Sequence, residues 1–256
     1  MRDAPPNSEV QEFGGASLNL EETMNLKNAT ALITGSSSGI GYSIAKVLTD
    51  SGARVAITGR DEKKLYKAAE LLNAVAIRAD VTNEADVQRT FREALQVFSH
   101  LDILVNNAGV GVLKKLVDTD RATFDRVFAT NVTGAMLMGR EAAKHFIEQN
   151  KGNIVNICST ASLRGAANGT TYYASKFALR GMTECWRAEL RQYNIRVFLI
   201  NPSEVLTNFG AAGFSQPENP TKLRGEEVAH MVRAALEMAD RGFTPELSIF
   251  ATNPKD

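Results

Sequence analysis

Short runs of apolar and β-branched residues alternate along the chain with longer segments whose apolar residues recur every three or four positions. Such short runs are typical of strands buried on both faces, and the longer spacing is typical of amphipathic helices. The runs predict seven strands, over residues 30–34, 54–58, 75–78, 103–106, 153–157, 196–200 and 246–250. Because the strands alternate with helices, the sequence predicts an α/β fold, with one doubly wound domain around a seven-stranded parallel sheet.

Residues 1–23 do not share this pattern. They are polar, include Pro5, Pro6, Gly14 and Gly15, and show no sustained periodicity. We expect them to form a flexible N-terminal extension. Met24 stands directly before the first apolar run, so we expect the folded domain to span residues 24–256.

The composition is that of an ordinary globular protein of 256 residues, 44% hydrophobic and 23% charged. The 29 basic and 29 acidic residues balance, which gives no electrostatic reason to expect nucleic acid or an anionic membrane as a partner. No apolar run has the length of a membrane span. Cys158 and Cys185 lie far apart, and the three histidines lack paired-ligand spacing. We therefore expect a cytoplasmic protein without a bound metal.

A turn rich in glycine and serine, TGSSSGIG over residues 34–41, stands between the first predicted strand and the first predicted helix. Glycine is needed where the backbone turns tightly or approaches a pyrophosphate without an intervening Cβ. The helix N-terminus offers N–H groups and a partial positive charge to phosphates. A plain strand–helix connection would also fit such a turn, but its position favours a dinucleotide site.

With this turn the sequence resembles the short-chain dehydrogenase/reductases, whose shorter members carry the pattern T-G-x-x-x-G-x-G. The resemblance runs from about Leu26 to the C-terminus. It implies a Rossmann-type fold, a nicotinamide dinucleotide cofactor, and oxidation or reduction at a CH–OH or carbonyl group. The longer epimerase branch of the superfamily usually spaces these glycines differently.

The end of the second predicted strand bears on the choice of cofactor. In a dinucleotide fold an acidic residue there binds the adenosine ribose. Here the position holds Gly59, followed by Arg60, so a carboxylate is replaced by a guanidinium that can pair with a 2′-phosphate. A solvated Arg60 at the start of a helix is the plainer interpretation. Gly59 and Arg60 together favour NADP(H).

Tyr172 and Lys176 stand four residues apart in YYASK, within a segment of helical spacing. Residues four apart share a helix face, so a phenol and an ammonium can converge on one cavity. The ammonium stabilises the phenolate form and makes proton exchange near neutral pH easier. Taken alone, the pair also fits a helix with one buried tyrosine and one surface lysine. Tyr173, three residues from Lys176, is a rival to Tyr172.

The resemblance decides between these interpretations, because the family's catalytic serine precedes its tyrosine by thirteen residues and Ser159 stands at that interval from Tyr172. It implies Ser159, Tyr172 and Lys176 as the catalytic residues; Thr160 and Ser162 are nearby hydroxyls that the interval disfavours. Asn131 lies within a helical pattern over about residues 123–148. By the same resemblance it holds a water that links Lys176 to solvent, and a local bend is the alternative.

Further cofactor contacts also follow from the resemblance. Asp80 follows the third predicted strand, where the family's aspartate contacts adenine, and NNAG follows the fourth. Ser203 replaces the glycine that the family usually has after Pro202. The expected cofactor site comprises Gly35, Ser37, Ser38, Gly39, Ile40, Gly41, Arg60, Asp80, Val81, Asn107, Ala108, Gly109, Tyr172, Lys176, Pro202, Val205 and Thr207.

Overall similarity is strongest to the 3-oxoacyl-thioester reductases, which favours a 3-oxoacyl thioester as the substrate, with small ketones or diketones next. It implies NADPH-dependent reduction of a ketone on a small molecule, carried by acyl carrier protein or coenzyme A as in fatty acid biosynthesis, and a homotetramer. We expect Phe209 and Phe214 to close over an apolar tail or to pack on the helix below. Leu163 and Arg164 are expected beside the same opening.

Two other functions use the same features. An NADP-linked alcohol or sugar dehydrogenase would need the same residues and differ only in substrate and direction. A non-catalytic NADP-binding regulator would keep the fold and the cofactor site. Ser159, Tyr172 and Lys176 argue against a pure binding protein, which needs none of them.

Overall fold

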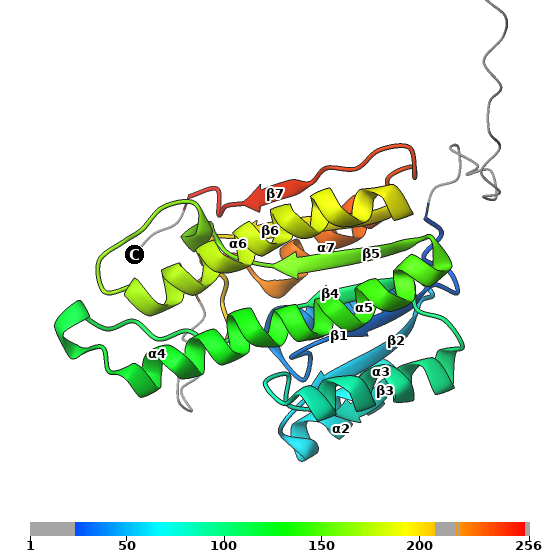
Figure 1. Ribbon diagram of the computed structural model, residues 1–256, viewed down its shortest axis with the longest axis horizontal. Coiled ribbons are helices and arrows are strands. Elements are labelled where there is room, and N and C mark those ends of the chain that lie inside the picture. The colour runs from blue at the N-terminus through cyan, green and yellow to red at the C-terminus, as the bar shows by residue number, and fades with distance from the viewer. Residues whose placement is uncertain (1–23, 208–218, 220, 254–256) are drawn as a thin grey trace, which may run out of the picture.

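The computed structural model describes residues 24–207, 219 and 221–253, and these form one α/β domain (Figure 1). Seven parallel strands make a single sheet in the order β3-β2-β1-β4-β5-β6-β7. The strands are β1 (Thr30–Ile33), β2 (Arg54–Gly59), β3 (Val75–Arg78), β4 (Ile103–Asn106), β5 (Gly152–Ile157), β6 (Ile195–Pro202) and β7 (Glu246–Ile249). The predicted fold class and strand number are therefore confirmed.

Helices cover both faces of the sheet. They are α1 (Gly39–Asp50), α2 (Glu62–Leu72), α3 (Glu84–Phe98), α4 (Arg121–Phe128), α5 (Ala135–Gln149), α6 (Thr170–Leu190) and α7 (Gly225–Leu236). One core joins α1, α2 and α7 to the side chains of Ile33, Ile57 and Phe198, and a second joins α3 and α5 to Leu32, Leu104 and Val197. Alternate residues of one strand thus serve opposite cores, which explains the continuous apolar runs in the sequence.

Two predicted elements differ from the structure by more than one residue at a boundary. The sixth strand continues through Asn201 and Pro202, because Ser203 N donates to Ile249 O of β7 at 2.9 Å and extends the pairing. The helical pattern over 123–148 is divided: α4 ends at Phe128, a π-helical turn, η2 (Ala129–Gly134), follows, and α5 begins at Ala135. A π-helical turn inserts one residue into a helix and re-aims the side chains within it.

The carboxyl ends of all seven strands lie at one edge of the sheet, as parallel pairing requires. Ligands of doubly wound sheets bind at this edge. The glycine turn, Asp80, the NNAG segment, Ser159 and Pro202 each follow or end a strand there. The predicted extension over 1–23, Phe209 and Phe214 lie outside the described residues.

Candidate active site

The glycine turn between β1 and α1 is held by the segment after β4. Gly35 has a φ of 62°, and a Cβ placed on it would lie 2.7 Å from the Cα of Ala108, so only glycine fits. Thr34 Oγ1 accepts hydrogen bonds from the backbone N–H groups of Asn107 and Ala108, each at 3.0 Å. Asn107 Nδ2 donates to the carbonyls of Thr34 and Gly35 at 2.9 and 3.0 Å. The predicted residues Asn107 and Ala108 therefore shape the turn.

The first turn of α1 has no side-chain cap, which sets it apart from its neighbours. Asp61, Asn83 and Asp120 accept backbone hydrogen bonds at the starts of α2, α3 and α4, whereas Ser38 makes no such bond at the start of α1. An uncapped helix N-terminus behind a glycine turn suits a phosphate group. Thr207 lies beside Gly39, with its methyl group 3.4 Å from a Cβ built there. These residues fit a dinucleotide pyrophosphate.

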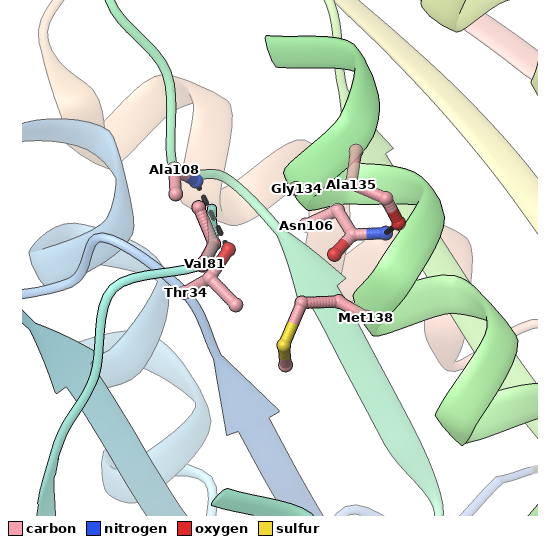
Figure 2. Close-up of a pocket in the computed structure, with 7 residues that line it drawn as sticks. All are labelled: Thr34, Val81, Asn106, Ala108, Gly134, Ala135 and Met138. Atoms are coloured by element: carbon pink, nitrogen blue, oxygen red, sulfur yellow. Dashed lines mark hydrogen bonds between the residues drawn. The ribbon is translucent and has the colours of Figure 1, made fainter. Parts of the chain in front are cut away.

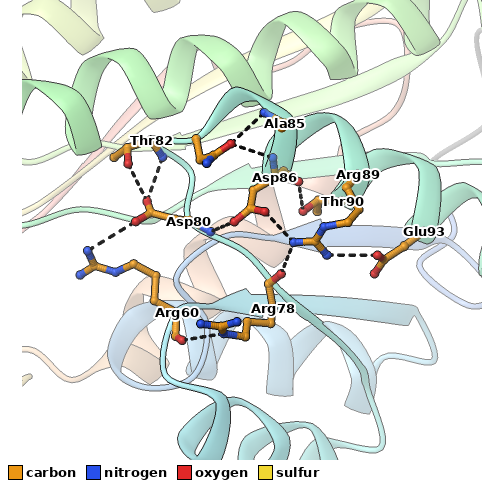
Figure 3. A network of polar contacts seen from close by, with 10 residues as sticks. Arg60, Arg78, Asp80, Thr82, Ala85, Asp86, Arg89, Thr90 and Glu93 are labelled. Carbon is orange, nitrogen blue, oxygen red and sulfur yellow. Dashed lines mark hydrogen bonds and ion pairs between the residues drawn. The ribbon is translucent and has the colours of Figure 1, made fainter.

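Charged residues surround the ends of β2 and β3 (Figure 3). Arg60 Nη1 lies 3.9 Å from Asp80 Oδ2, and the Arg60 side chain is 66% exposed. Asp80 also accepts hydrogen bonds from the N–H and hydroxyl of Thr82, at 3.0 and 2.9 Å. A Cβ on Gly59 would lie 3.3 Å from Ser37 Oγ, so a larger residue would crowd that hydroxyl. The side chains of Ser37, Arg60 and Asp80 thus gather beside one strand end.

Arg78 belongs to this group but was not predicted from the sequence. Its Nε donates to the carbonyl of Arg60 at 3.4 Å, and its own carbonyl accepts from Arg89 Nη2 at 2.8 Å. Arg89 also pairs with Asp86 at 2.8 Å, and this hydrogen bond lowers the pKa of the Asp86 carboxyl. Arg78 stands opposite Gly59 in the sheet register, a proximity that requires knowledge of strand order.

Tyr172 and Lys176 lie on one face of α6, next to the end of β5. Lys176 is 5% exposed; its Nζ is 5.8 Å from the centre of the Tyr172 ring and donates to the carbonyl of Ile157 at 3.0 Å. The alternative of a surface lysine is therefore wrong. The ring of Tyr173 meets that of Tyr172 edge-on, with centroids 6.1 Å apart. Tyr173 also lies against Gly169, where a Cβ would overlap its ring.

Ser159 stands two residues beyond β5 and starts a short 3-10 turn, η3 (Thr160–Ser162), that packs against α6. Its Oγ accepts from Ala161 N at 3.1 Å and its carbonyl from Ser162 N at 2.9 Å. Ser162 is 1% exposed and donates its hydroxyl to Asn201 Oδ1 at 3.1 Å, which removes it as a rival. Ser159 and Thr160 remain partly accessible.

Asn131 lies on η2 and is 1% exposed. Its Oδ1 accepts from Val110 N at 2.8 Å, and its Nδ2 donates to Val110 O at 2.9 Å and to Ser175 Oγ at 3.0 Å. Ser175 Oγ in turn donates to the carbonyl of Tyr172 at 2.7 Å. Both N–H donors of Asn131 are thus used within the protein, and the helix around it is π-helical. The side chain connects the loop after β4 to the helix that carries Tyr172.

Pro202, Val205 and Thr207 follow one another at the end of β6. Pro202 is buried, and a parallel bridge between Val205 and Leu223 holds this segment, with Leu206 N donating to Leu223 O at 2.7 Å. The φ angle of Ser203 is not positive. A serine therefore fits the position where glycine is usual in the resembled family.

A small pocket, with no room for a water molecule, lies behind the NNAG segment (Figure 2). Its lining comprises Thr34, Val81, Asn106, Ala108, Gly134, Ala135 and Met138. Asn106 Nδ2 donates to Ala135 O and to Asn156 Oδ1, while its buried Oδ1 has no hydrogen-bond partner and faces the cavity. Small-molecule pockets usually measure ~300–1,000 Å³. This space is too small for a substrate and lies between α5 and the glycine turn that follows β1.

Comparison with known proteins identifies the family of this chain. The sequence model described as short chain dehydrogenase matches residues 29–218, more than half of the chain. The chain belongs to the short-chain dehydrogenase family. The chain is 35% identical over 190 residues to the secoisolariciresinol dehydrogenase of Forsythia intermedia, covering 72% of this chain and 69% of that protein.

Solved structures of short-chain dehydrogenases share the fold. A 3-ketoacyl-(acyl-carrier-protein) reductase from Brucella melitensis, complexed with NADH, has a TM-score of 0.82 and 30% identity, covering 89% of this chain and 98% of that one. An alcohol dehydrogenase from Thermococcus sibiricus, complexed with 5-hydroxy-NADP, has a TM-score of 0.80 and 25% identity, covering 90% and 100%. As a member of this family, the chain is an oxidoreductase.

Two predicted absences concern membranes and metals. In the described part of the chain, no helix combines the length and apolarity needed to cross a membrane. Across residues 24–207, 219 and 221–253, no group of three or more histidine, cysteine or acidic side chains is arranged to hold a metal ion.

Proposed function

We propose that this short-chain dehydrogenase is an NADPH-dependent carbonyl reductase that converts a ketone into a secondary alcohol. The observation that carries the proposal is the buried ammonium of Lys176, 5.8 Å from the Tyr172 ring and fixed by the carbonyl of Ile157. A buried cation beside a partly exposed phenol stabilises the phenolate form of that phenol. Such a pair is suited to giving a proton to a bound substrate or taking one from it.

Each residue of the group has a distinct role in this proposal. Tyr172 gives its phenolic proton to the carbonyl oxygen of the substrate, and Ser159 donates a hydrogen bond to the same oxygen as charge develops there. Lys176 stabilises the phenolate that Tyr172 leaves behind. Asn131 helps to supply the replacement proton through water. A bound nicotinamide dinucleotide supplies the hydride to the carbonyl carbon.

The preference for NADPH rests on Gly59 and Arg60. Arg60 is 66% exposed, and the carboxylate of Asp80 lies 3.9 Å from its Nη1. A long, exposed ion pair of this kind stabilises little, so it does not prevent Arg60 from pairing with a 2′-phosphate. Asp80 and Val81 are proposed to contact the adenine. Among the structural neighbours, one is complexed with NADH and another with 5-hydroxy-NADP.

The proposed substrate is a 3-oxoacyl thioester on coenzyme A or acyl carrier protein, as in fatty acid biosynthesis. The likeness to the Brucella reductase supports this choice. Exposed apolar residues provide a second argument: Leu163, four residues after Ser159, is 42% exposed, and Leu113, Leu116 and Val117, between β4 and α4, are 67, 71 and 89% exposed. Exposed apolar groups beside an active site suit an acyl chain.

The proposal extends to assembly and location. Phe177 on α6 is 44% exposed, which favours burial against another copy in a homotetramer. The two cysteines, Cys158 and Cys185, carry free thiols, as is usual for proteins of the cytoplasm.

A second candidate is an NADP-linked alcohol dehydrogenase that works in the oxidative direction. The Forsythia relative is named as a dehydrogenase, and so is the Thermococcus structure. The same residues would serve, with Tyr172 accepting rather than donating the proton.

The experiment is to mix purified protein with acetoacetyl-coenzyme A and to follow nicotinamide absorbance with NADPH and NADH in parallel. The proposal predicts rapid loss of absorbance with NADPH and much slower loss with NADH. A small diketone and a secondary alcohol with NADP⁺ serve as comparison substrates. Turnover of the alcohol alone would favour the second candidate, and no turnover with any substrate would contradict both.

A further inference from the structure

A chain of polar side chains runs behind the proposed reaction centre and joins three elements that carry it. Ser162, at the end of η3, donates its hydroxyl to Asn201 Oδ1 at 3.1 Å. Asn201, near the end of β6, donates from Nδ2 to Glu246 Oε1 on β7 at 2.8 Å. The same carboxylate oxygen accepts from Arg180 Nη1 on α6 at 2.5 Å. Ser162 and Asn201 are 1 and 0% exposed.

The chemistry of these groups fixes the direction of every hydrogen bond. A carboxylate can only accept, so Asn201 must present its NH₂ group to Glu246 and its oxygen to Ser162. Ser162 must therefore act as the donor, and its hydroxyl cannot rotate without leaving Asn201 Oδ1 unpaired in a buried site. Arg180 Nη1 donates to the same Glu246 oxygen as Asn201, and Glu184 lies 3.2 Å from Arg180 Nε.

Strand register explains why these groups meet. Leu199 of β6 stands opposite Glu246 of β7, so their side chains share one face of the sheet, and Asn201 shares that face because it is two residues further along. Leu199 packs there with Leu179 of α6 and Cys158. The polar chain thus lies between the sheet and α6, directly beyond an apolar layer.

We propose that Asn201 is a positioning residue that sets the geometry of Ser159 through η3 and relates it to α6, which carries Tyr172 and Lys176. Ser159 and Ser162 hold the two ends of η3: Ser159 accepts from Ala161 N and Ser162 N, and Ser162 is tied to Asn201. This inference rests on the proposed function for its kinetic consequence, but its structural consequence can be measured without turnover.

The position of Asn201 predicts that its loss affects kcat and not cofactor affinity. It lies next to Pro202, at the reaction end of the site, whereas Arg60 and Asp80 follow β2 and β3 at the other end of the sheet. Small displacements of reacting groups lower the rate by up to ~100-fold. Loss of Asn201 should therefore lower kcat and leave the affinity for the adenosine half of the cofactor unchanged.

The test is Asn201→Leu, which keeps the branched side-chain shape but removes both hydrogen bonds. Hydrogen exchange of the Ala161 and Ser162 amides, which both donate to Ser159, is expected to accelerate about tenfold or more, and kcat with NADPH to fall by about tenfold. Binding of 2′,5′-ADP should stay within about twofold of wild type. Asn156→Leu is the matched control, because Asn156 is equally buried and bonds Thr183 of α6 at 2.8 Å without touching η3.

Ser162→Ala provides a milder variant in case Asn201→Leu does not fold, and it should show the same pattern at smaller amplitude. Unchanged exchange at Ala161 and Ser162 in a folded variant would overturn the inference, whether or not the protein turns over a ketone. Equal effects of Asn201→Leu and Asn156→Leu on exchange and kcat would also overturn it, since they would indicate a general loss of stability. An inactive wild type with faster exchange in the variants would contradict only the proposed function.

Discussion

At the carboxyl edge of the sheet, the two ends are built from different kinds of side chain. Around β2 and β3, exposed and half-exposed charges form ion pairs, with the Arg60 side chain 66% exposed and Asp80 36% exposed. Around β5, β6 and α6, buried amides, hydroxyls and one lysine form short hydrogen bonds, and Lys176, Asn131 and Asn201 are 5, 1 and 0% exposed.

The two regions therefore differ in how well they tolerate substitution. A buried polar group that loses its partner costs ~1–3 kcal/mol, so the groups near Tyr172 tolerate few changes. An exposed ion pair contributes ~0–1 kcal/mol, so charges near Arg60 can change with little effect on the fold. We therefore propose that residues around β5, β6 and α6 carry the chemistry and that residues around β2 and β3 set the choice of cofactor.

The largest effect is expected at Tyr172. Tyr172→Phe removes the only hydroxyl of that side chain and should lower kcat by about a thousandfold, while NADPH still binds. Stopped-flow absorbance and NADPH fluorescence measure the two quantities. Tyr173→Phe is the matched control, since its ring lies edge-on to Tyr172 and it should keep kcat within about threefold. A reversal of the two results would show that the wrong tyrosine is assigned.

A smaller loss is expected at the hydroxyl after β5. Ser159→Ala should lower kcat by about a hundredfold, as for other groups that stabilise charge on a reacting oxygen. Steady-state kinetics with a saturating ketone measures it. Thr160→Val changes the next hydroxyl on η3 and should have little effect. If Thr160→Val caused the larger loss, the spacing argument for Ser159 would be wrong.

The smallest effect is expected in the charged region. The hydrogen bond from Arg89, followed by that from Asp80 N, holds the pKa of Asp86 below its ordinary 3.8. The ionised form thus stabilises the fold above that pH, and the stabilisation is lost as the pH falls from 3.8 toward the lower folded-state pKa. Asp86→Asn should cost less than about 1 kcal/mol at pH 7, because the pair is about one-third exposed.

Urea unfolding at pH 7 and at pH 3 checks this expectation for Asp86→Asn. The difference in unfolding free energy between wild type and variant should narrow at the lower pH. Asp50→Asn, which alters the exposed pair with Lys46, is the control. A difference that widened in acid would contradict the assigned sign.

The sequence predicted much of the fold because buried parallel strands leave an unbroken apolar run. All seven strands were found, and β3 and β4 have the predicted bounds. The turn at Gly35 was also readable, because its positive φ and its contact with Ala108 demand glycine.

Contacts that depend on strand order were not readable. Arg78 and Gly59 become neighbours only through the pairing of β3 with β2, and Asn201 meets Glu246 only through the pairing of β6 with β7. The π-helical turn at Asn131 adds one residue and leaves the apolar spacing nearly unchanged, so the pattern suggested one long helix. Ser175 stood within YYASK, and its spacing of three from Tyr172 was the one available signal.

The division between chemistry and cofactor choice is tested most directly by Arg60→Glu, assayed with NADPH and NADH at saturating ketone. Loss of a charged hydrogen bond to the 2′-phosphate should raise the KM for NADPH about tenfold or more relative to that for NADH. We expect kcat with either cofactor to stay within about twofold of the wild-type value. An equal rise in both KM values, or a fall in kcat with NADH, would contradict it.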